Sequence, residues 1–315
     1  MPNNPHVLVI GGTGWVGHQI ALAFDRAGYQ VTICSRGMKS LFAKAIPKRF
    51  QRIVADKNQA ADMDRVLAQH YQVVVDSVPG VVALKHLAKY PEKIGHYLHC
   101  SSTGGYTPMA HLPGDETMTY RGWGEKEAVD TLALKVYQQV GLKTTVIRPP
   151  VILGPGALPV DNLGGRSINF IPDILNEARI DVANDGMALF QPVHVVSLAD
   201  AFVLAAQTPD SAGQIYNICQ EKAVTVARYL QLVAEALNRK ANLNFLPMKD
   251  MLMKYFANSD GKPLLFLMEH MCFDISKAKQ QLAYCPYPST EKTIVETARW
   301  AAGNKEEAWR NHSKK

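Results

Sequence analysis

Apolar residues in the first half of the chain form short continuous runs, separated by longer stretches in which they recur every three or four positions. The runs predict buried strands at residues 7–10, 29–34, 52–56, 73–77, 96–100 and 144–148. The spaced pattern predicts helices between them, at residues 16–27, 63–69, 81–88 and 125–140. Because strands that are apolar throughout must be covered on both faces, this alternation predicts an α/β fold with a doubly wound parallel sheet.

The second half of the chain is punctuated differently, with glycines and prolines spread through residues 154–172. The apolar pattern there predicts one strand and two helices, at residues 214–218, 199–207 and 225–237. In open α/β sheets the part that contacts the substrate lies beyond the carboxyl edge of the strands. We therefore expect a first domain at residues 1–155, to which residues 190–218 return, and a smaller substrate-binding part made of residues 156–189 and 219–315.

A glycine-rich turn lies between the first predicted strand and the first predicted helix, and it reads Gly11-Gly12-Thr13-Gly14-Trp15-Val16-Gly17. Gly11 allows a tight turn, Gly14 removes a side chain where backbone must approach a phosphate, and Gly17 lets the helix pack close to the strand. The amino end of the helix then offers unpaired N–H groups and a positive dipole end to a pyrophosphate. Glycines also occur in ordinary strand-to-helix turns. This context nevertheless predicts a Rossmann-type, dinucleotide-binding fold with contacts from Gly11, Thr13, Gly14, Trp15, Val16 and Gly17.

The end of the second predicted strand bears on which dinucleotide is bound. An acidic residue at this place would accept hydrogen bonds from the ribose 2′-hydroxyl of NAD. The chain has Ser35 and Arg36 there instead, and a guanidinium suits a 2′-phosphate bidentately. We therefore expect NADP rather than NAD as the cofactor. The alternative is that Arg36 is a solvated loop residue.

Composition narrows the class of protein. At 315 residues, with 47% hydrophobic and 20% charged residues, the chain is typical of a soluble globular protein. No apolar run reaches the roughly 18 residues that a membrane span needs. Residues 1–5 lack the basic and apolar regions of a signal peptide. A cytoplasmic protein without a membrane partner is therefore expected.

Cysteine, histidine and charge patterns exclude further classes. The five cysteines are scattered and form no CxxC pair, and the ten histidines show no metal-ligand spacing. Neither a disulfide framework nor a metal is therefore expected. The net charge is +6, but the basic residues are interspersed with acids, which argues against a nucleic-acid partner.

Segments along nearly the whole chain carry a family resemblance. They are the glycine turn and residues 100–106 (CSSTGGY), 148–155 (RPPVILGP), 193–200 (VHVVSLAD) and 273–278 (FDISKA). In this order they resemble the landmarks of extended short-chain dehydrogenase/reductases, the NAD(P)-dependent epimerase/dehydratase group. The resemblance implies an NAD(P) cofactor and a small-molecule substrate. It also implies further cofactor contacts from Asp56, Ser77, Lys126, Pro149 and Val151.

The resemblance is incomplete at the family's usual catalytic pair, which is a tyrosine four residues before a lysine on one helix face. In the family the tyrosine transfers a proton, and the lysine lowers its pKa and holds the nicotinamide ribose. Lys126 matches the lysine, and Asp130 matches an acid that often follows it, but the tyrosine position falls on Gly122. Tyr120 lies six residues before Lys126 and reaches the same face only if the helix begins irregularly. Ser102, Tyr120 and Lys126 are the candidate catalytic residues.

Three hypotheses remain open for this site. In the first, Tyr120 swings in and acts with Ser102 and Lys126. In the second, Lys126 acts with Ser102 or a substrate group and without a tyrosine, as in atypical members that resemble isoflavone reductases. In the third, the site is chemically silent and binds nucleotide as a regulator, like NmrA-type proteins.

The sequence thus predicts an NADP-dependent oxidoreductase of the extended short-chain dehydrogenase/reductase type that acts on a small organic substrate. In this hypothesis Ser102 polarises the substrate oxygen, while Lys126 fixes the ribose and supplies positive potential. The alternatives are a catalytically silent NADP-binding regulator and a nucleotide-sugar epimerase or dehydratase, which the missing tyrosine disfavours. RNA binding, as in chloroplast stem-loop-binding relatives, needs a basic face that the sequence does not display. Polar and apolar residues are mixed on the predicted helices, so a monomer and a homodimer both stay open.

Overall fold

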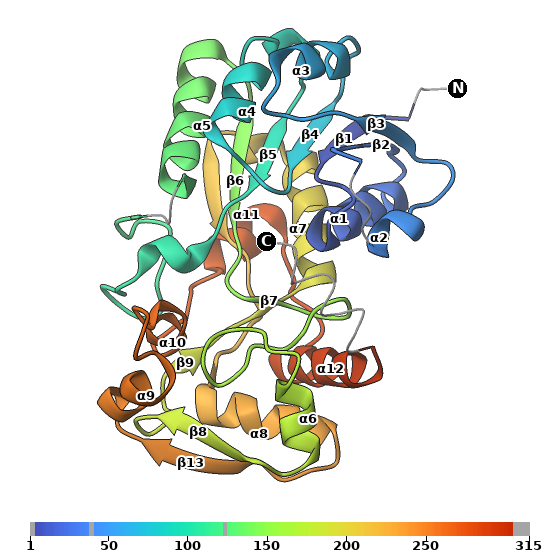
Figure 1. The fold of residues 1–315 in the computed structure, drawn as a ribbon. Coiled ribbons are helices and arrows are strands. Elements are labelled where there is room, and N and C mark those ends of the chain that lie inside the picture. Colours follow the sequence, from blue (N-terminus) through green and yellow to red (C-terminus); the bar gives the residue numbers. More distant parts are fainter. Residues whose placement is uncertain (1–3, 38–40, 122–124, 305–315) are drawn as a thin grey trace.

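A seven-stranded sheet forms the centre of the computed structural model, which describes residues 4–37, 41–121 and 125–304 (Figure 1). Its strands are β1 (His6–Ile10), β2 (Gln30–Ser35), β3 (Gln51–Val54), β4 (Val73–Asp76), β5 (Tyr97–Cys100), β6 (Thr144–Arg148) and β11 (Gln214–Asn217). They pair in the order β11-β6-β5-β4-β1-β2-β3, and every pair is parallel. The predicted doubly wound parallel sheet is confirmed. Its order reverses between β1 and β4, and open sheets bind ligands at such a switch point.

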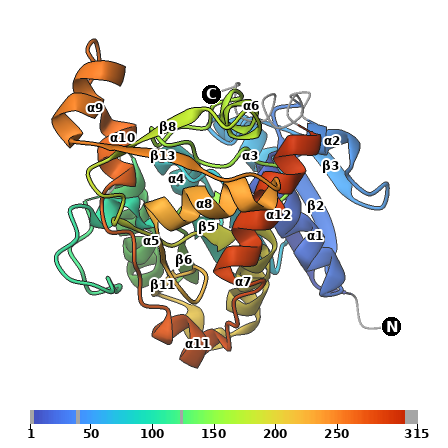
Figure 2. The same ribbon diagram turned by 90° about the horizontal axis from the view of Figure 1, so that it is seen from below.

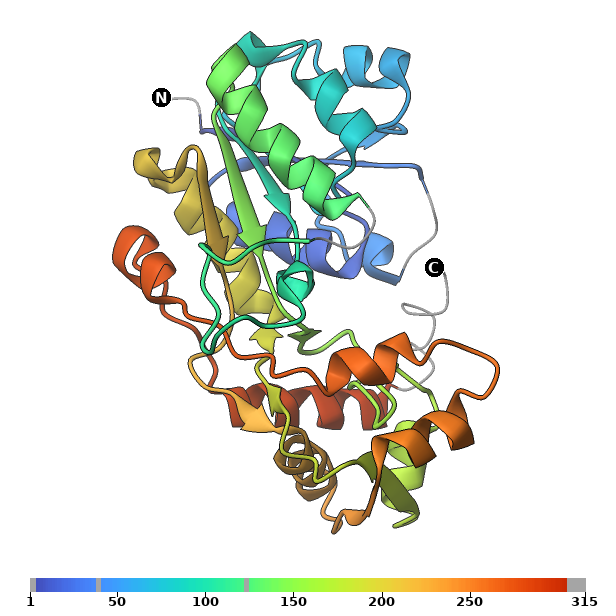
Figure 3. The ribbon, with the colours of Figure 1, turned by 90° about the vertical axis from the view of Figure 1, so that its left-hand side faces the viewer.

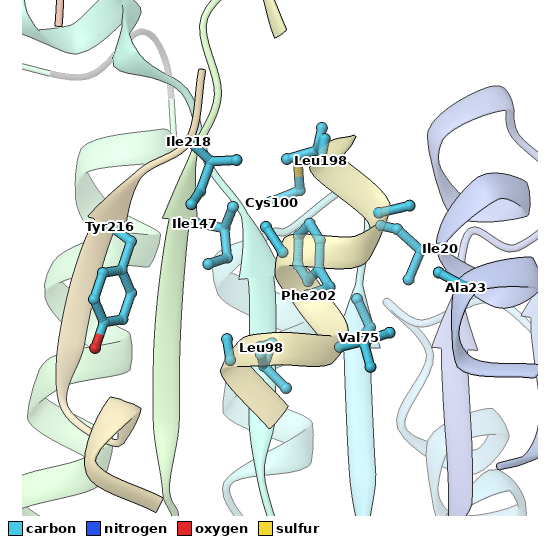
Figure 4. Packing of buried hydrophobic residues seen from close by; sticks show 14 of the residues in the cluster. Ile20, Ala23, Val75, Leu98, Cys100, Ile147, Leu198, Phe202, Tyr216 and Ile218 are labelled. Atoms are coloured by element: carbon cyan, nitrogen blue, oxygen red, sulfur yellow. The ribbon is translucent and has the colours of Figure 1, made fainter. Parts of the chain in front are cut away.

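Helices cover both faces of this sheet because neighbouring residues along each strand point to opposite sides. The covering helices are α1 (Trp15–Arg26), α3 (Ala60–Val66), α4 (Val81–Leu87), α5 (Lys126–Val140) and α7 (Val195–Gln207). Val75 packs with residues of α1 and α7 on one face, where Figure 4 shows Ile20 and Phe202. Leu8 and Val74 pack on the other face against α3, α4 and α5. A short helix, α2 (Leu41–Lys44), follows β2.

Two of these helices begin earlier than the apolar pattern predicts. Helix α3 begins at Ala60 rather than at residue 63. Its first residues are alanines, which have the highest helix propensity, and an acid, which suits the first turn of a helix. Neither residue type extends the spacing of large apolar residues from which the helix was predicted. Helix α7 begins at Val195 rather than at residue 199, because the His194 Nδ1 accepts the Val196 N–H at 3.2 Å. Histidine is not one of the usual capping residues, so the start of α7 could not be predicted from a capping motif.

The remaining elements lie mostly beyond the carboxyl ends of the sheet strands, as Figure 3 shows. They are β7 (Ile152–Leu153), α6 (Phe170–Leu175), β8 (Arg179–Ala183), β9 (Leu189–Phe190), β10 (Val193–His194), β12 (Val224–Thr225), α8 (Val226–Ala236), β13 (Asn242–Leu246), α9 (Met248–Tyr255), α10 (Lys262–Leu267), α11 (Ser276–Leu282) and α12 (Thr290–Gly303). Strands β8 and β13 pair in parallel. Helices α6, α8 and α12 share a second apolar core with β8, and Figure 2 shows α8 and α12 next to each other. Between visits to this second part the chain returns to the sheet as β11.

No helix within the described ranges is both long and apolar enough to cross a membrane. The longest of them, α5, has 15 residues, whereas a membrane-spanning helix needs about 20 apolar residues.

Candidate functional site

The glycine turn joins β1 to α1 at the carboxyl edge of the sheet. Gly11 has a φ of 81°, in the left-handed region that favours glycine, and its carbonyl accepts the Gly14 N–H at 2.9 Å. A Cβ on Gly17 would lie 2.3 Å from the Gly11 carbonyl oxygen, which excludes a side chain there. A Cβ on Gly14 would come no closer than 3.3 Å to that oxygen. The turn therefore has the conformation that its glycines predict, and the amino end of α1 opens onto it.

A cavity of about 230 Å³ lies beside this turn. Its walls come from the carboxyl ends of β1, β2, β3 and β4, which are neighbours in the sheet. It brings together six of the predicted cofactor contacts, which are Gly11, Thr13, Gly14, Ser35, Arg36 and Asp56. Ser77, also predicted, lies beneath the turn, where its hydroxyl donates to the Ile10 carbonyl at 2.9 Å.

Trp15 connects the glycine turn to the second part of the molecule. Its indole Nε1 donates to the Pro155 carbonyl at 2.8 Å, in the loop after β7. A Cβ on Gly156, whose φ is 106°, would lie 2.4 Å from the same nitrogen. Val16, the next predicted contact, packs against the core of the sheet. The sequence predicted a cofactor contact for Trp15 and carried no signal for this connection.

Lys57 is a cavity residue that sequence reasoning missed. Its ammonium lies 3.0 Å from both carboxylate oxygens of Asp76, at the end of β4, and also donates to the Val78 carbonyl. The Asp76 side chain is fully buried, and that of Lys57 is 17% exposed. The neighbouring Asp56 carboxylate accepts the Asn58 N–H at 3.0 Å. A buried acid at the end of an apolar strand needs a cationic partner. The sequence of residues 73–76, three valines followed by Asp76, therefore indicated that such a partner exists.

Ser102 and Tyr120 meet at the end of β5. The Ser102 hydroxyl accepts the Gly104 N–H at 3.1 Å and caps a short 3₁₀ helix, Thr103–Tyr106. The Tyr120 hydroxyl donates to the Ser102 carbonyl at 2.8 Å and lies 3.1 Å from the Ser101 hydroxyl. The structure therefore brings Tyr120 to the same strand end as Ser102. It does so from the segment that precedes α5.

A buried polar network surrounds this strand end. Asp130 of α5 accepts hydrogen bonds from His99 Nε2 at 2.7 Å, from the Ser101 hydroxyl at 2.9 Å and from Arg148 Nε at 3.0 Å. Arg148 Nη1 donates to the Tyr106 hydroxyl at 2.7 Å. The Arg148 guanidinium carbon lies 3.6 Å from the centre of the Tyr120 ring. The side chains of Arg148 and Asp130 are 3% and 4% exposed, so this ion pair is almost completely withdrawn from water.

The network sets the charges of its members. Burial acts to raise the pKa of the Asp130 carboxyl, but His99, Arg148 and Ser101 together hold it below its ordinary value. Burial, reinforced by the Asp130 charge, raises the pKa of the Tyr120 phenol, while Ser101 and Arg148 oppose that rise. At neutral pH the carboxylate is therefore charged, and Tyr120 carries its proton.

Lys126 is the first residue of α5 and is half-buried. Burial raises the pKa of the Cys100 thiol, at the end of β5, to about 12, and the charge of Lys126 opposes that rise. Gly122 and Gly124, on which an irregular helix start would depend, lie outside the described residues. Two more predicted contacts follow β6: the Pro149 carbonyl accepts the Thr103 N–H at 2.9 Å, and the Val151 carbonyl accepts the Val193 N–H at 2.9 Å.

Residues 73–219 match the model of the NAD dependent epimerase/dehydratase family. These residues resemble that family. The predicted resemblance to extended short-chain dehydrogenase/reductases is thereby confirmed. The matched segment contains Ser102, Tyr120, Lys126, Asp130 and Arg148, whereas the glycine turn precedes it.

Several proteins of known name are similar to this chain in sequence or in structure. The chain is 28% identical over 303 residues to the chloroplast stem-loop binding protein of 41 kDa b of Arabidopsis thaliana, covering 89% of this chain and 75% of that protein. UDP-glucose 4-epimerase of Thermotoga maritima has a similar structure, with 17% identity, a TM-score of 0.76, and coverage of 95% and 99%. dTDP-glucose 4,6-dehydratase of Bacillus anthracis, solved with NAD, has 17% identity, a TM-score of 0.77, and coverage of 96% and 98%. At such identities the two solved structures show a shared fold.

Two groups of candidate residues thus lie along one sheet edge. The first lines the cavity at β1 to β4, and the second surrounds the ends of β5 and β6. In the second group Ser102, Tyr120 and Asp130 are brought together by contacts that their sequence spacing did not predict.

Proposed function

We propose that the protein binds a nicotinamide dinucleotide at the glycine turn and transfers hydride between it and a small organic substrate. The observation that carries this proposal is the cavity whose walls join the glycine turn to Ser35, Arg36 and Asp56. The family match, and the NAD named with the dehydratase structure, support the same class of cofactor. When bound, the cofactor supplies the hydride chemistry at its nicotinamide ring.

The residues present fit such a cofactor. The cavity volume of about 230 Å³ is below the roughly 300–1,000 Å³ of a complete ligand pocket, so the cavity suits the adenosine portion. The open backbone at Gly14 and the amino end of α1 offer N–H groups to a pyrophosphate. Trp15, Val16, Gly17 and Ser77 shape this turn. Three predicted contacts, Lys126, Pro149 and Val151, come at the start of α5 and after β6. A bound dinucleotide that reaches them would extend from the glycine turn along the carboxyl edge of the sheet toward β5 and β6.

We further propose NADP as the preferred cofactor. Arg36 is exposed at the rim of the cavity, next to the half-buried Ser35. Asp56, which also lines the cavity, accepts the Asn58 N–H, and Asp76 is paired with Lys57. A 2′-phosphate would therefore meet a guanidinium at this rim. The NAD of the solved dehydratase favours NAD instead, so the preference needs a direct measurement.

At the reactive end we assign one role to each candidate. The Ser102 hydroxyl polarises the substrate oxygen by donating a hydrogen bond to it. Lys126 holds the ribose and supplies positive potential, and Tyr120 provides a proton. The hydrogen bond from the Tyr120 hydroxyl to the Ser102 carbonyl supports the assignments of these two residues.

Calorimetric titration with NADPH and with NADH tests the proposal. We expect tighter binding of NADPH, and Arg36→Ala should remove this preference while leaving the binding of NADH within about twofold. Arg228→Ala, an exposed arginine paired with Glu235 on α8, is the matched control. Failure of both cofactors to bind would refute the oxidoreductase hypothesis. Binding without turnover of any carbonyl substrate would favour the silent regulator.

A second candidate function is supported by the solved structures. The structure of UDP-glucose 4-epimerase resembles that of this chain over 95% of this chain's length. The matched family includes epimerases and dehydratases. An epimerase regenerates its cofactor within each cycle. Incubation with UDP-glucose, followed by analysis of the sugar nucleotides, would therefore show UDP-galactose without net NADH or NADPH consumption. The hydride-transfer function predicts consumption of the cofactor and no epimer.

We propose the same division of the chain as the sequence predicted, with residues 190–218 returning to the first domain. The pairing of β11 with β6, and the packing of α7 against α1, support this division. Limited proteolysis tests it, since cleavage at the junctions near residues 155, 190 and 218 should precede cleavage within the sheet.

A further inference from the structure

We propose that Arg148 positions Tyr120 as the proton donor of this site, in place of the helical tyrosine that the family pattern lacks here. This inference rests on the proposed hydride-transfer function. Three features support it: the orientation of the Tyr120 hydroxyl, the clamp on its ring, and the way in which Arg148 itself is held.

The Tyr120 ring is clamped from two directions. The Arg148 guanidinium stacks on its face at 3.6 Å, and the Tyr106 ring meets it at 5.4 Å and 80°. Cations bind the faces of aromatic rings, and aromatic pairs favour such edge contacts. The clamp directs the hydroxyl to the carbonyl of Ser102 and the hydroxyl of Ser101. Tyr120 therefore presents its proton at the residue proposed to polarise the substrate.

Arg148 is fixed in turn by groups on separate elements. Two of its nitrogens, Nε and Nη2, lie 3.0 Å and 2.9 Å from the same Asp130 oxygen, and Nη1 donates to Tyr106. Because Arg148 ends β6 and Asp130 lies on α5, the guanidinium cannot turn away from Tyr120 without breaking a buried ion pair. Lys126 lies four residues before Asp130, on the same side of α5. The network therefore connects α5, the end of β6 and the tyrosine.

This arrangement explains how a tyrosine outside the helix could transfer a proton. A bound nicotinamide would supply hydride to the substrate carbonyl carbon in a reduction, and the Tyr120 phenol would give its proton to the carbonyl oxygen as its O–H bond breaks. The phenolate that remains is stabilised by the stacked guanidinium. The Ser101 hydroxyl, which donates to Asp130 in the resting site, lies close enough to donate to the phenolate instead. Tyr120 then recovers its proton from water.

The ionisation of Tyr120 is the direct test, and it needs neither cofactor nor substrate. With 3,5-difluorotyrosine placed at position 120 of the full chain, ¹⁹F NMR follows one phenol whose pKa lies closer to neutral. Loss of the stacked cation in Arg148→Met should raise that pKa by about one unit. Arg148→Lys should raise it less, because the ammonium keeps a charge but cannot stack flat on the ring. Arg26→Met, an exposed arginine distant from the site, is the control and should leave it unchanged.

Two outcomes would overturn the proposal. The first is a pKa in Arg148→Lys and Arg148→Met within about 0.2 units of the parent; if Arg148→Met does not fold, Arg148→Lys alone decides. The second is a Tyr120→Phe variant that binds cofactor and keeps its turnover number within twofold, since the proposal predicts a loss of at least tenfold with little change in KM. Absence of cofactor binding in the unaltered protein would refute the proposed function instead, and the NMR measurement separates the two failures.

Discussion

At β1 to β4 the sheet edge is built from a turn of consecutive residues and the short loops that follow each strand. At β5 and β6 it is built from side chains of the segment before α5, of α5 itself and of two strands. Each end contains a buried carboxylate. The charge of Asp76 is balanced mainly by the ammonium of Lys57, whose side chain remains 17% exposed. Asp130 receives hydrogen bonds from His99, Ser101 and Arg148, and its ion pair with Arg148 is only 3–4% exposed.

The difference has an energetic consequence. A buried charge is expensive unless several donors share it. Water can reach Lys57 and replace part of what a substitution removes, whereas water cannot reach Arg148 without opening the network. The end at β5 and β6 should therefore tolerate substitution less well than the end at β1 to β4, although the latter has the more recognisable motif.

The largest effect is expected from Asp130→Asn. The substitution leaves the Arg148 guanidinium buried without its countercharge, which should cost about 3–5 kcal/mol of unfolding free energy. Urea denaturation measures it. Asp200→Asn is the control, because Asp200 pairs with the half-exposed Arg26 and should lose less than about 1 kcal/mol. Equal losses in the two variants would contradict the distinction between buried and exposed pairs.

Lys57→Met should have a smaller effect. Asp76 loses a charged hydrogen-bond donor but lies beside a cavity that admits water, so we expect a loss of about 1.5–3 kcal/mol. Lys85→Met, at an exposed position on α4, should change the unfolding free energy by less than about 0.5 kcal/mol. A loss for Lys57→Met as large as that for Asp130→Asn would remove the contrast between the two ends.

Gly17→Ala tests the close approach within the glycine turn. The new methyl would lie 2.3 Å from the Gly11 carbonyl oxygen, so we expect about 1–3 kcal/mol of strain and weaker dinucleotide binding. Gly303→Ala is the matched control, because a Cβ there meets nothing within 4 Å and alanine favours the helix. Its stability should stay the same or rise by up to about 1 kcal/mol. A neutral Gly17→Ala would mean that the turn can relax.

Trp15→Phe should have the smallest effect. It removes the indole N–H that donates to the exposed Pro155 carbonyl, and water can take its place, so the expected loss is about 0.5–1 kcal/mol. Thermal unfolding monitored by circular dichroism can resolve it. A loss above about 2 kcal/mol would show that contact with the second part stabilises the glycine turn by more than this one hydrogen bond contributes.

Local features of the sequence determined the sheet, most of its helices and the glycine turn. Strand burial and helix period repeat over a few residues, and the positive φ of Gly11 and the close approach at Gly17 follow from a motif of seven residues. Even here the start of α7 was missed, because a histidine caps it. Lys57 was missed as well, because its partner Asp76 is 19 residues away in the sequence, after α3.

Only the tertiary structure decided the arrangement of side chains at the ends of β5 and β6. The family's catalytic tyrosine would stand at Gly122, four residues before Lys126, and the chain has no tyrosine there. The spacing between Tyr120 and Lys126 did not predict where the Tyr120 side chain lies. The fold brings Tyr120 to Ser102 by stacking it on Arg148, whose partner Asp130 lies on another element. Such a network depends on which side chains become buried together, because burial is what forces each charge and hydroxyl to find a partner. That information belongs to the packing of separate elements and to no single segment of the sequence.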